Sequence, residues 1–176
     1  MKTVGRSGRR TRAATPSPAG GGAPRFRILG RTACASLLGR NTVGRLAFSL
    51  HDRVDIEPLH YVFDGGWLYG RTSPGSKLLT IPHNHWVAFE VDEIDGVFDW
   101  RSVVVHGALY VVSPDVTARE RRAWDRGIQL LRCVVPDTGA PTDPVPFRTV
   151  VFRIHADEMT GRAASFTARR ALSKRA

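Results

Sequence analysis

Short apolar runs separated by turn residues dominate the middle of the chain. In the segment 54–63 apolar and polar residues alternate, which is typical of a strand with one buried face. The triplet Asp64-Gly65-Gly66 then predicts a tight hairpin turn into the next strand. Strands are expected at 43–50, 54–63, 67–72, 86–91, 100–112 and 149–155. Strands at this short spacing, joined by tight turns, predict a mainly β protein built as an antiparallel barrel.

Helical patterns between these strands predict peripheral helices at 32–38, 74–80 and 113–131. The last of them begins at Ser113-Pro114, because a capping side chain followed by proline is typical of a helix start. The acidic segment 92–96 is interpreted as a loop, and Gly107 predicts a bulge or bend inside the long strand. The polar end of the chain, from 156 onward, is expected to be frayed.

The formal net charge of +10 arises at the start of the chain. Ten Lys or Arg residues and no Asp or Glu precede Asp52, whereas 16 basic and 16 acidic residues occur from there onward. The head is rich in Gly, Ala, Pro, Arg, Ser and Thr and lacks the apolar surface needed to order itself. We therefore expect a disordered basic tail over 1–27, one domain over 28–158 and a flexible C-terminal tail over 159–176.

This charge distribution bears on the partners and the location of the protein. The neutral body favours a small-molecule ligand, and nucleic acid is expected to bind only weakly, through the basic tail. No segment of the sequence is long and apolar enough to span a membrane. Cys34 and Cys133 lie far apart and in no CxxC pair, so they are interpreted as free thiols in a reducing cytoplasm.

The segment 70–77 carries the clearest chemical signal. Ser73 before Pro74 predicts a helix start, where backbone amides are free. The polar residues around that start are Arg71, Thr72, Ser76 and Lys77. Hydroxyls, cations and free amides at a helix N-terminus form a site for a phosphate monoester. The alternative is that Arg71 and Lys77 are ordinary surface cations.

Other patterns of catalytic chemistry are missing from the sequence. His83 and His85 lie close together, but no Cys or carboxylate is within easy sequence reach, so no metal site is expected. No nucleophile-elbow pattern is seen, and the acidic segment 92–99 is interpreted as a solvated turn rather than an acid–base pair.

Five segments, in order along the chain, resemble one known family. These segments are 44–48, 57–62, 70–78, 87–91 and 100–107. At this spacing they are similar to the pyridoxamine 5'-phosphate oxidase-like superfamily, nearest to its nitroimidazole-resistance-type flavin-binding proteins. The resemblance covers about 30–155. The true pyridoxamine phosphate oxidases end in a basic segment that has no counterpart in 166–171, so oxidation of vitamin B6 is not expected.

The resemblance implies an FMN-binding split β-barrel, antiparallel and of Greek-key type, that works as a homodimer with FMN at the interface. The residues that it places around the FMN phosphate are Arg71, Thr72, Ser73, Ser76 and Lys77. It also implies ring contacts from the backbone of Pro58, Leu59 and His60, and from Trp100 and Ser102 of a partner subunit. The alternative for Trp100 is a core aromatic.

His60 is the candidate for a catalytic role, because a histidine beside the ring could donate a proton. The alternative is a half-buried strand histidine with a satisfied partner. Since a flavin carries the electron transfer itself, the protein needs no sharper catalytic residue. The expected function is that of a flavin-dependent oxidoreductase acting on a small organic acceptor, similar to a nitroreductase.

Three alternatives to this function stay open. The first is a deazaflavin-dependent reductase, in which Arg25, Arg27 or Arg31 would meet the acidic tail of the cofactor. The second is a flavin- or haem-binding carrier or sensor without turnover. The third is a nucleic-acid-associated protein that uses its basic head.

Overall fold

The structure, a computed structural model, describes residues 23–50, 53–75 and 84–166. Two helices are found in this part of the chain, α1 (Arg31–Arg40) and α3 (Ala118–Leu131). Its strands are β1 (Pro24–Leu29), β2 (Val43–Leu50), β3 (Arg53–Asp64), β4 (Trp67–Thr72), β5 (Trp86–Gly96), β6 (Asp99–Val112), β7 (Val150–His155) and β8 (Glu158–Phe166). The predicted helix over 74–80 lies largely outside the described residues.

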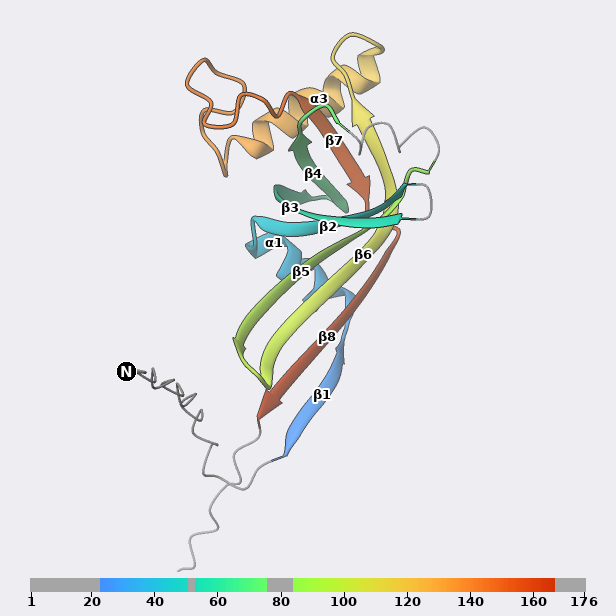
Figure 1. The fold of residues 1–176 in the computed structure, drawn as a ribbon, viewed down its shortest axis with the longest axis vertical. Coiled ribbons are helices and arrows are strands. Elements are labelled where there is room, and N and C mark those ends of the chain that lie inside the picture. Colours follow the sequence, from blue (N-terminus) through green and yellow to red (C-terminus); the bar gives the residue numbers. More distant parts are fainter. Residues whose placement is uncertain (1–22, 51–52, 76–83, 167–176) are drawn as a thin grey trace, which may run out of the picture.

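Six antiparallel strands close into a barrel. Around the ring each strand pairs with the next in the order β2, β3, β4, β7, β6, β5 and back to β2. β8 and β1 extend the sheet outward from the first half of β6, while α3 lies over β4 and β7 at the other end (Figure 1). The predicted antiparallel barrel in a mainly β protein is therefore confirmed.

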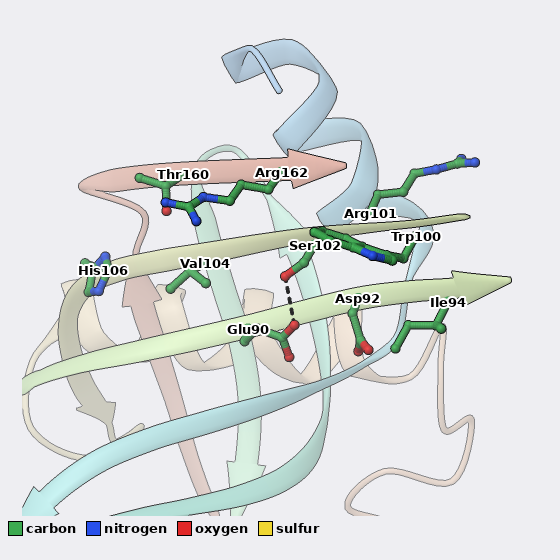
Figure 2. A pocket seen from close by; sticks show the side chains of 10 residues that line it. All are labelled: Glu90, Asp92, Ile94, Trp100, Arg101, Ser102, Val104, His106, Thr160 and Arg162. Carbon is green, nitrogen blue, oxygen red and sulfur yellow. Dashed lines mark hydrogen bonds between the residues drawn. The ribbon is translucent and has the colours of Figure 1, made fainter. Parts of the chain in front are cut away.

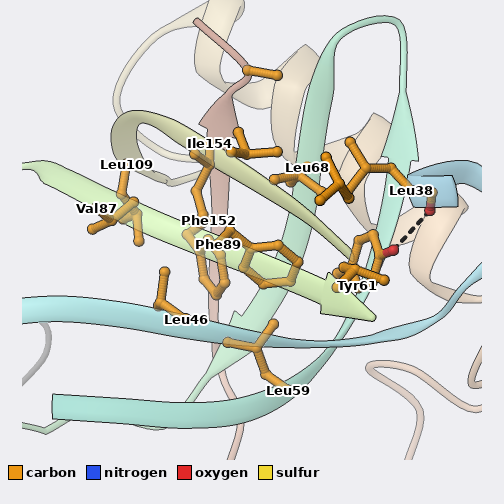
Figure 3. Packing of buried hydrophobic residues seen from close by; sticks show 14 of the residues in the cluster. Leu38, Leu46, Leu59, Tyr61, Leu68, Val87, Phe89, Leu109, Phe152 and Ile154 are labelled. Carbon is orange, nitrogen blue, oxygen red and sulfur yellow. Dashed lines mark hydrogen bonds between the residues drawn. The ribbon is translucent and has the colours of Figure 1, made fainter. Parts of the chain in front are cut away.

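Alternating apolar residues fill the inside of the barrel. Tyr61, Phe89 and Phe152 are fully buried there, and the Tyr61 ring meets the Phe89 ring edge-on at 4.9 Å (Figure 3). The Tyr61 hydroxyl donates a hydrogen bond of 2.7 Å to the Leu38 carbonyl of α1. Burying each such side chain stabilises the fold by about 1.5–3 kcal/mol. The two-residue period of the strands thus turns every second side chain into the core and leaves the others outside.

Gly107 marks the point where β6 changes partner. Residues 100–106 of β6 pair with β8, and residues 109–112 pair with β7. The pairing with β5 runs through Gly107 without a shift, and the register shift of that pair lies at 94–96 instead. A Cβ atom at Gly107 would overlap with the backbone carbonyl of His155. The glycine therefore allows two backbones to approach closely, and the predicted bulge lies elsewhere.

Four predicted boundaries are wrong. The helix after Ser113 begins only at Ala118, because Thr117 is its cap and accepts the Glu120 amide at 3.1 Å. The acidic segment 92–96 belongs to β5. The end of the chain does not fray at 156, since β8 runs to Phe166 between β1 and β6, and β1 starts inside the predicted tail at Pro24.

Small residues explain why β8 was missed. Gly161 and Ala163 are buried on the side of the sheet that faces α1, and a Cβ at Gly161 would come within 2.5 Å of the Cys34 sulfur of α1. Small side chains on this side of β8 thus allow α1 to pack close against the strand. Because small side chains contribute little to a hydrophobic pattern, the sequence did not predict a strand here.

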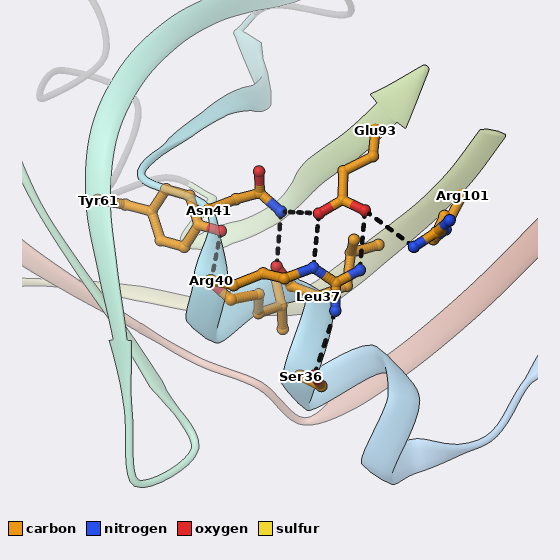
Figure 4. A network of polar contacts seen from close by, with 8 residues as sticks. Ser36, Leu37, Arg40, Asn41, Tyr61, Glu93 and Arg101 are labelled. Carbon is orange, nitrogen blue, oxygen red and sulfur yellow. Dashed lines mark hydrogen bonds and ion pairs between the residues drawn. The ribbon is translucent and has the colours of Figure 1, made fainter. Parts of the chain in front are cut away.

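A polar network fastens α1 to β5 and β6 (Figure 4). Arg40 donates two hydrogen bonds to the Glu93 carboxylate, of 2.6 and 2.8 Å, and Asn41 donates a third of 2.9 Å. Arg101 approaches the same carboxylate at 3.5 Å. Arg40, with Asn41 and Arg101, lowers the pKa of Glu93 from 4.5 to about 2, although burial opposes this shift.

Replacing Glu93 by Gln is expected to lower the free energy of unfolding by roughly 1–2 kcal/mol at neutral pH. Because the folded-state pKa is depressed, the contribution of Glu93 is fully present above pH 4.5 and is lost as the pH falls towards 2. Melting temperatures of the wild type and Glu93→Gln should therefore differ at pH 7 and converge near pH 2. Asp115→Asn, in an exposed pair with Arg121, is the control and should melt like the wild type throughout.

Candidate functional site

The candidate site lies on the sheet face turned away from α1. Strand pairing carries rows of side chains across this face: Ser102 lies between Asp92 and Arg162, and Trp100 between Ile94 and Ala164. We define the outer sheet face by Phe26, Ile28, Arg45, Ile56, Pro58, His60, Glu90, Asp92, Ile94, Trp100, Ser102, Val104, His106, Thr160 and Arg162. The side chain of Leu59 points the other way, into the core, so only its backbone can meet a ligand here.

The predicted ring contacts therefore share one face but not one place. Pro58 and His60 lie on β3, whereas Trp100 and Ser102 lie on β6, with β2 and β5 between them. Three strand spacings amount to roughly 14 Å. The two groups of residues thus stand apart within a single chain.

A cavity of about 540 Å³ opens on the outer sheet face over β5, β6 and β8 (Figure 2). Ile94, Trp100 and Val104 give it apolar walls. A second hollow, of about 470 Å³, shares Trp100 and Arg162 with the first and continues to Phe26 and Ile28 on β1. The larger cavity combines these apolar walls with several polar and charged side chains, and its size is typical of a cofactor site.

The polar groups of the larger cavity are linked to one another. Ser102 donates a hydrogen bond of 2.9 Å to one oxygen of Glu90, and Arg45 donates one of 3.0 Å to the other. Arg45 also contacts Asp92 at 2.5 Å. The sequence-based reasoning missed Glu90, Asp92 and Arg45. The predicted strand ended at 91, and only its continuation through Asp92 shows that Glu90 and Asp92 face the same way.

The start of the predicted phosphate turn is buried. Arg71 and Thr72 are 7 % and 4 % exposed. The Arg71 guanidinium donates to both oxygens of Asp143, at 2.5 and 3.1 Å, and to the Arg148 carbonyl at 3.5 Å. Arg71, with the backbone amides of Gly139 and Val145, holds the pKa of Asp143 well below its usual range. Sequence reasoning could not find this pair, because 72 residues separate its members.

The remaining residues of that turn are only partly placed. The Thr72 hydroxyl lies 3.4 Å from the Ser73 carbonyl, and Ser73 is half-buried. Ser76 and Lys77 lie outside the described residues. A role for these five residues at a phosphate thus stays a prediction.

The sequence model of the pyridoxamine 5'-phosphate oxidase family matches residues 30–163. The chain belongs to that family.

Individual relatives agree with this placement. A FAD-binding protein of Mesorhizobium loti is 29 % identical in sequence, with a TM-score of 0.65 over 81 % of this chain and 99 % of that one. An uncharacterized protein of Rhizobium meliloti is 29 % identical over 148 residues, 78 % of this chain and 95 % of its own. A putative 5-nitroimidazole antibiotic resistance protein of Bacteroides thetaiotaomicron shares the fold, with a TM-score of 0.60 at 15 % identity over 82 % of this chain and 90 % of that one. The predicted resemblance and the split barrel are confirmed.

In this family member the candidate catalytic residue, His60, is exposed at the edge of the outer sheet face. Its ring has no hydrogen-bond partner among the residues that the structure describes. His60, Arg71, Val145 and Arg148 line a small cavity of about 10 Å³ between the barrel and the segment 132–149. No observation tests proton donation by His60, which stays a prediction.

Two expected absences concern metal and membrane. Within 23–50, 53–75 and 84–166, no group of three or more His, Cys, Asp or Glu side chains could hold a metal ion. His85 is exposed and stacks on Trp86 at 5.7 Å, and His83 lies outside those ranges. Over the same ranges, no helix has both the length and the apolar character that crossing a bilayer requires. Cys34 is buried and Cys133 exposed, and both are free thiols.

Proposed function

We propose that this protein binds FMN on the outer sheet face and uses it to reduce a small organic acceptor. One observation carries the proposal: the strand registers bring Pro58, His60, Trp100 and Ser102 onto a single face that also holds a cavity of about 540 Å³. The family relationship supports a flavin, since the Mesorhizobium loti relative is a FAD-binding protein. The flavin would supply the electron transfer, and the protein its binding and orientation.

We propose further that a second copy of the chain covers the outer sheet face. Phe26, Ile28, Ile56 and Ile94 are 65 %, 86 %, 59 % and 69 % exposed on it. Large apolar side chains gathered on one open sheet face are typical of an association surface. The roughly 14 Å between the two groups of ring contacts then has a simple reason, because each ring would take Pro58 and His60 from one subunit and Trp100 and Ser102 from the other.

The chain's own residues have separable tasks in such a site. Trp100 and Ile94 would exclude water from one side of the bound ring. The Ser102 hydroxyl, fixed by its bond to Glu90, would present its oxygen to a ring donor. Arg45 offsets the charge of Glu90 and Asp92, so the cavity is not strongly anionic. His60 would hold a proton at the edge of the site, beside a bound acceptor.

FAD is a second candidate cofactor. The hollow of about 470 Å³ beside the main cavity offers Phe26 and Trp100 for stacking and Arg162 for a phosphate group, which is what the nucleotide half of FAD would need. Deazaflavin remains the other alternative, because Arg27 lines the same hollow. Mass spectrometry of the ligand released by heat from purified protein distinguishes the three cofactors.

Replacing Ser76 and Lys77 together by Ala is expected to weaken FMN binding by roughly 2–4 kcal/mol, or about 30- to 1000-fold, since a hydroxyl and a charge-assisted contact to the phosphate are lost. Fluorescence titration of the apoprotein measures the affinity. The control is Ser113→Ala with Arg121→Ala, which removes a hydroxyl and a cation far from the outer sheet face.

Unchanged affinity in the Ser76/Lys77 variant would remove the phosphate assignment. A protein that binds neither FMN nor FAD would refute the proposed cofactor. If bound flavin stays oxidised with every nicotinamide donor, the carrier or sensor alternative is favoured over an oxidoreductase.

A further inference from the structure

We propose that Arg71 is a positioning residue: it fastens the segment 132–149 to β4 beside His60 and does not bind the phosphate of the cofactor. The part that concerns the cofactor rests on the proposed flavin function. This assignment differs from the one that the family resemblance implies for Arg71.

The surroundings of Arg71 leave no room for a phosphate. Its side chain is 8 % exposed, and its guanidinium already meets both oxygens of Asp143 and the Arg148 carbonyl. The cavity that it lines with His60 has about 10 Å³. Such a space accepts one water molecule at most. A phosphate would have to displace Asp143, and breaking this buried, bidentate pair would leave the Asp143 carboxylate buried without its partner, which is strongly destabilising.

Asp143 in turn organises the segment 132–149, which we call the α3–β7 loop. Its carboxylate accepts the amides of Gly139 at 2.8 Å and Val145 at 3.0 Å, and Gly139 has the positive φ of 75° that this turn requires. Nearby, Thr138 is fully buried and donates to the Val135 carbonyl at 2.7 Å. The loop therefore folds around one carboxylate, and Arg71 is the only side chain of the described barrel strands that donates to it.

The place of Arg71 links this loop to the proposed site. Arg71 is followed directly by Thr72, the first hydroxyl of the predicted phosphate turn, and it shares its small cavity with His60. The ion pair between Arg71 and Asp143 therefore holds two parts in place. One is the start of the predicted phosphate turn at Thr72, and the other is the α3–β7 loop, which lines the small cavity beside His60. Arg71 would act on a bound flavin through these neighbours.

The test compares Arg71→Met, Asp143→Asn and the double variant Arg71→Met/Asp143→Leu. The double variant keeps the test valid if a single variant fails to fold, because it leaves no buried charge unpaired. The matched control is Asp64→Asn with Arg126→Met, which removes an exposed ion pair of 3.0 Å between β3 and α3. FMN affinity is titrated at several salt concentrations, the visible absorption band of the bound flavin is recorded, and hydrogen exchange follows the Gly139 and Val145 amides.

We expect each single variant and the double variant to weaken FMN binding by the same factor, about 10-fold, because residues that act as one unit are not additive. The salt dependence of affinity should stay that of the wild type, since no phosphate contact is lost. The absorption band should shift alike in all three, and the two amides should exchange faster. The control should match the wild type in every measurement.

Two results would overturn the inference. One is tighter FMN binding by Asp143→Asn, which frees the guanidinium, together with a loss of 100-fold or more and a flatter salt dependence in Arg71→Met. The other is unchanged exchange of the Gly139 and Val145 amides in Arg71→Met. This second measurement needs no ligand, so it decides the anchoring even if the wild type binds no flavin and the proposed function fails.

Discussion

Gly107→Ala is expected to prevent the barrel from closing. A Cβ atom at this position would overlap with the carbonyl of His155, which is backbone and cannot rotate away as a side chain would. That carbonyl is also held in place by the amide of Asp157 at 3.0 Å. Either β6 and β7 separate or the chain fails to fold, and we expect a loss of about 4 kcal/mol or more in the free energy of unfolding.

Thermal unfolding followed by circular dichroism measures this loss. Gly39→Ala is the matched control, because a Cβ there would meet nothing within 4 Å and the residue lies in α1. Alanine is the better helix former, so the control should gain roughly 0.5–1 kcal/mol. A Gly107→Ala protein that melts within a few degrees of the wild type would show that the close approach at His155 is unimportant.

The double variant Ile28→Asp/Ile56→Asp is expected to be monomeric and to lose the cofactor. Both side chains are more than half exposed in the single chain, so water would solvate the new carboxylates in a monomer. A second copy on this face would have to bury them. Burying an unpaired carboxylate costs several kcal/mol, which should weaken the dimer by 100-fold or more. Analytical ultracentrifugation against the monomer mass of 19.4 kDa, together with flavin absorbance, gives the result.

Val116→Asp serves as the control for this variant. Val116 is 67 % exposed, but it precedes α3 and lies off the outer sheet face. The same charge at Val116 should leave the dimer and the bound flavin unchanged. A wild-type protein that binds flavin as a monomer at micromolar concentration would contradict the proposed second copy.

The sequence predicted the elements whose signals are local. The strand 67–72 and the turn before it follow from the alternation and from two glycines, which take φ angles of 56° and 84° in the hairpin. β8 could not be predicted in the same way, since the residues that it places under α1 are the small Gly161 and Ala163. The polar network around Glu93 likewise depends on α1 lying against β5, which no local pattern reveals.

The candidate site, like the fold, could be predicted only where the signal is local or the family resemblance supplies it. Pro58, His60, Trp100 and Ser102 were predicted through the family resemblance, and the strand registers put them on one face, although their contact with a cofactor stays a prediction. Glu90 and Asp92 belong to that face too, but their segment was interpreted partly as a loop, which hid their common direction. The pairing of Arg71 with Asp143 is a contact between distant parts of the chain, and charge and spacing alone could not separate it from a phosphate contact.

The pairing of β6 with two different strands, β8 and β7, affects how the protein folds during its synthesis. This strand of 14 residues, roughly 46 Å long, needs β7 along its second half and β8 along its first, and both are synthesised after β6 itself. Until then one side of β6 is an open edge, able to pair with any other extended chain. Since these pairings also join residues far apart in sequence, folding should be slow, and a nascent chain that stalls before 158 should be a ready substrate for chaperones or aggregation.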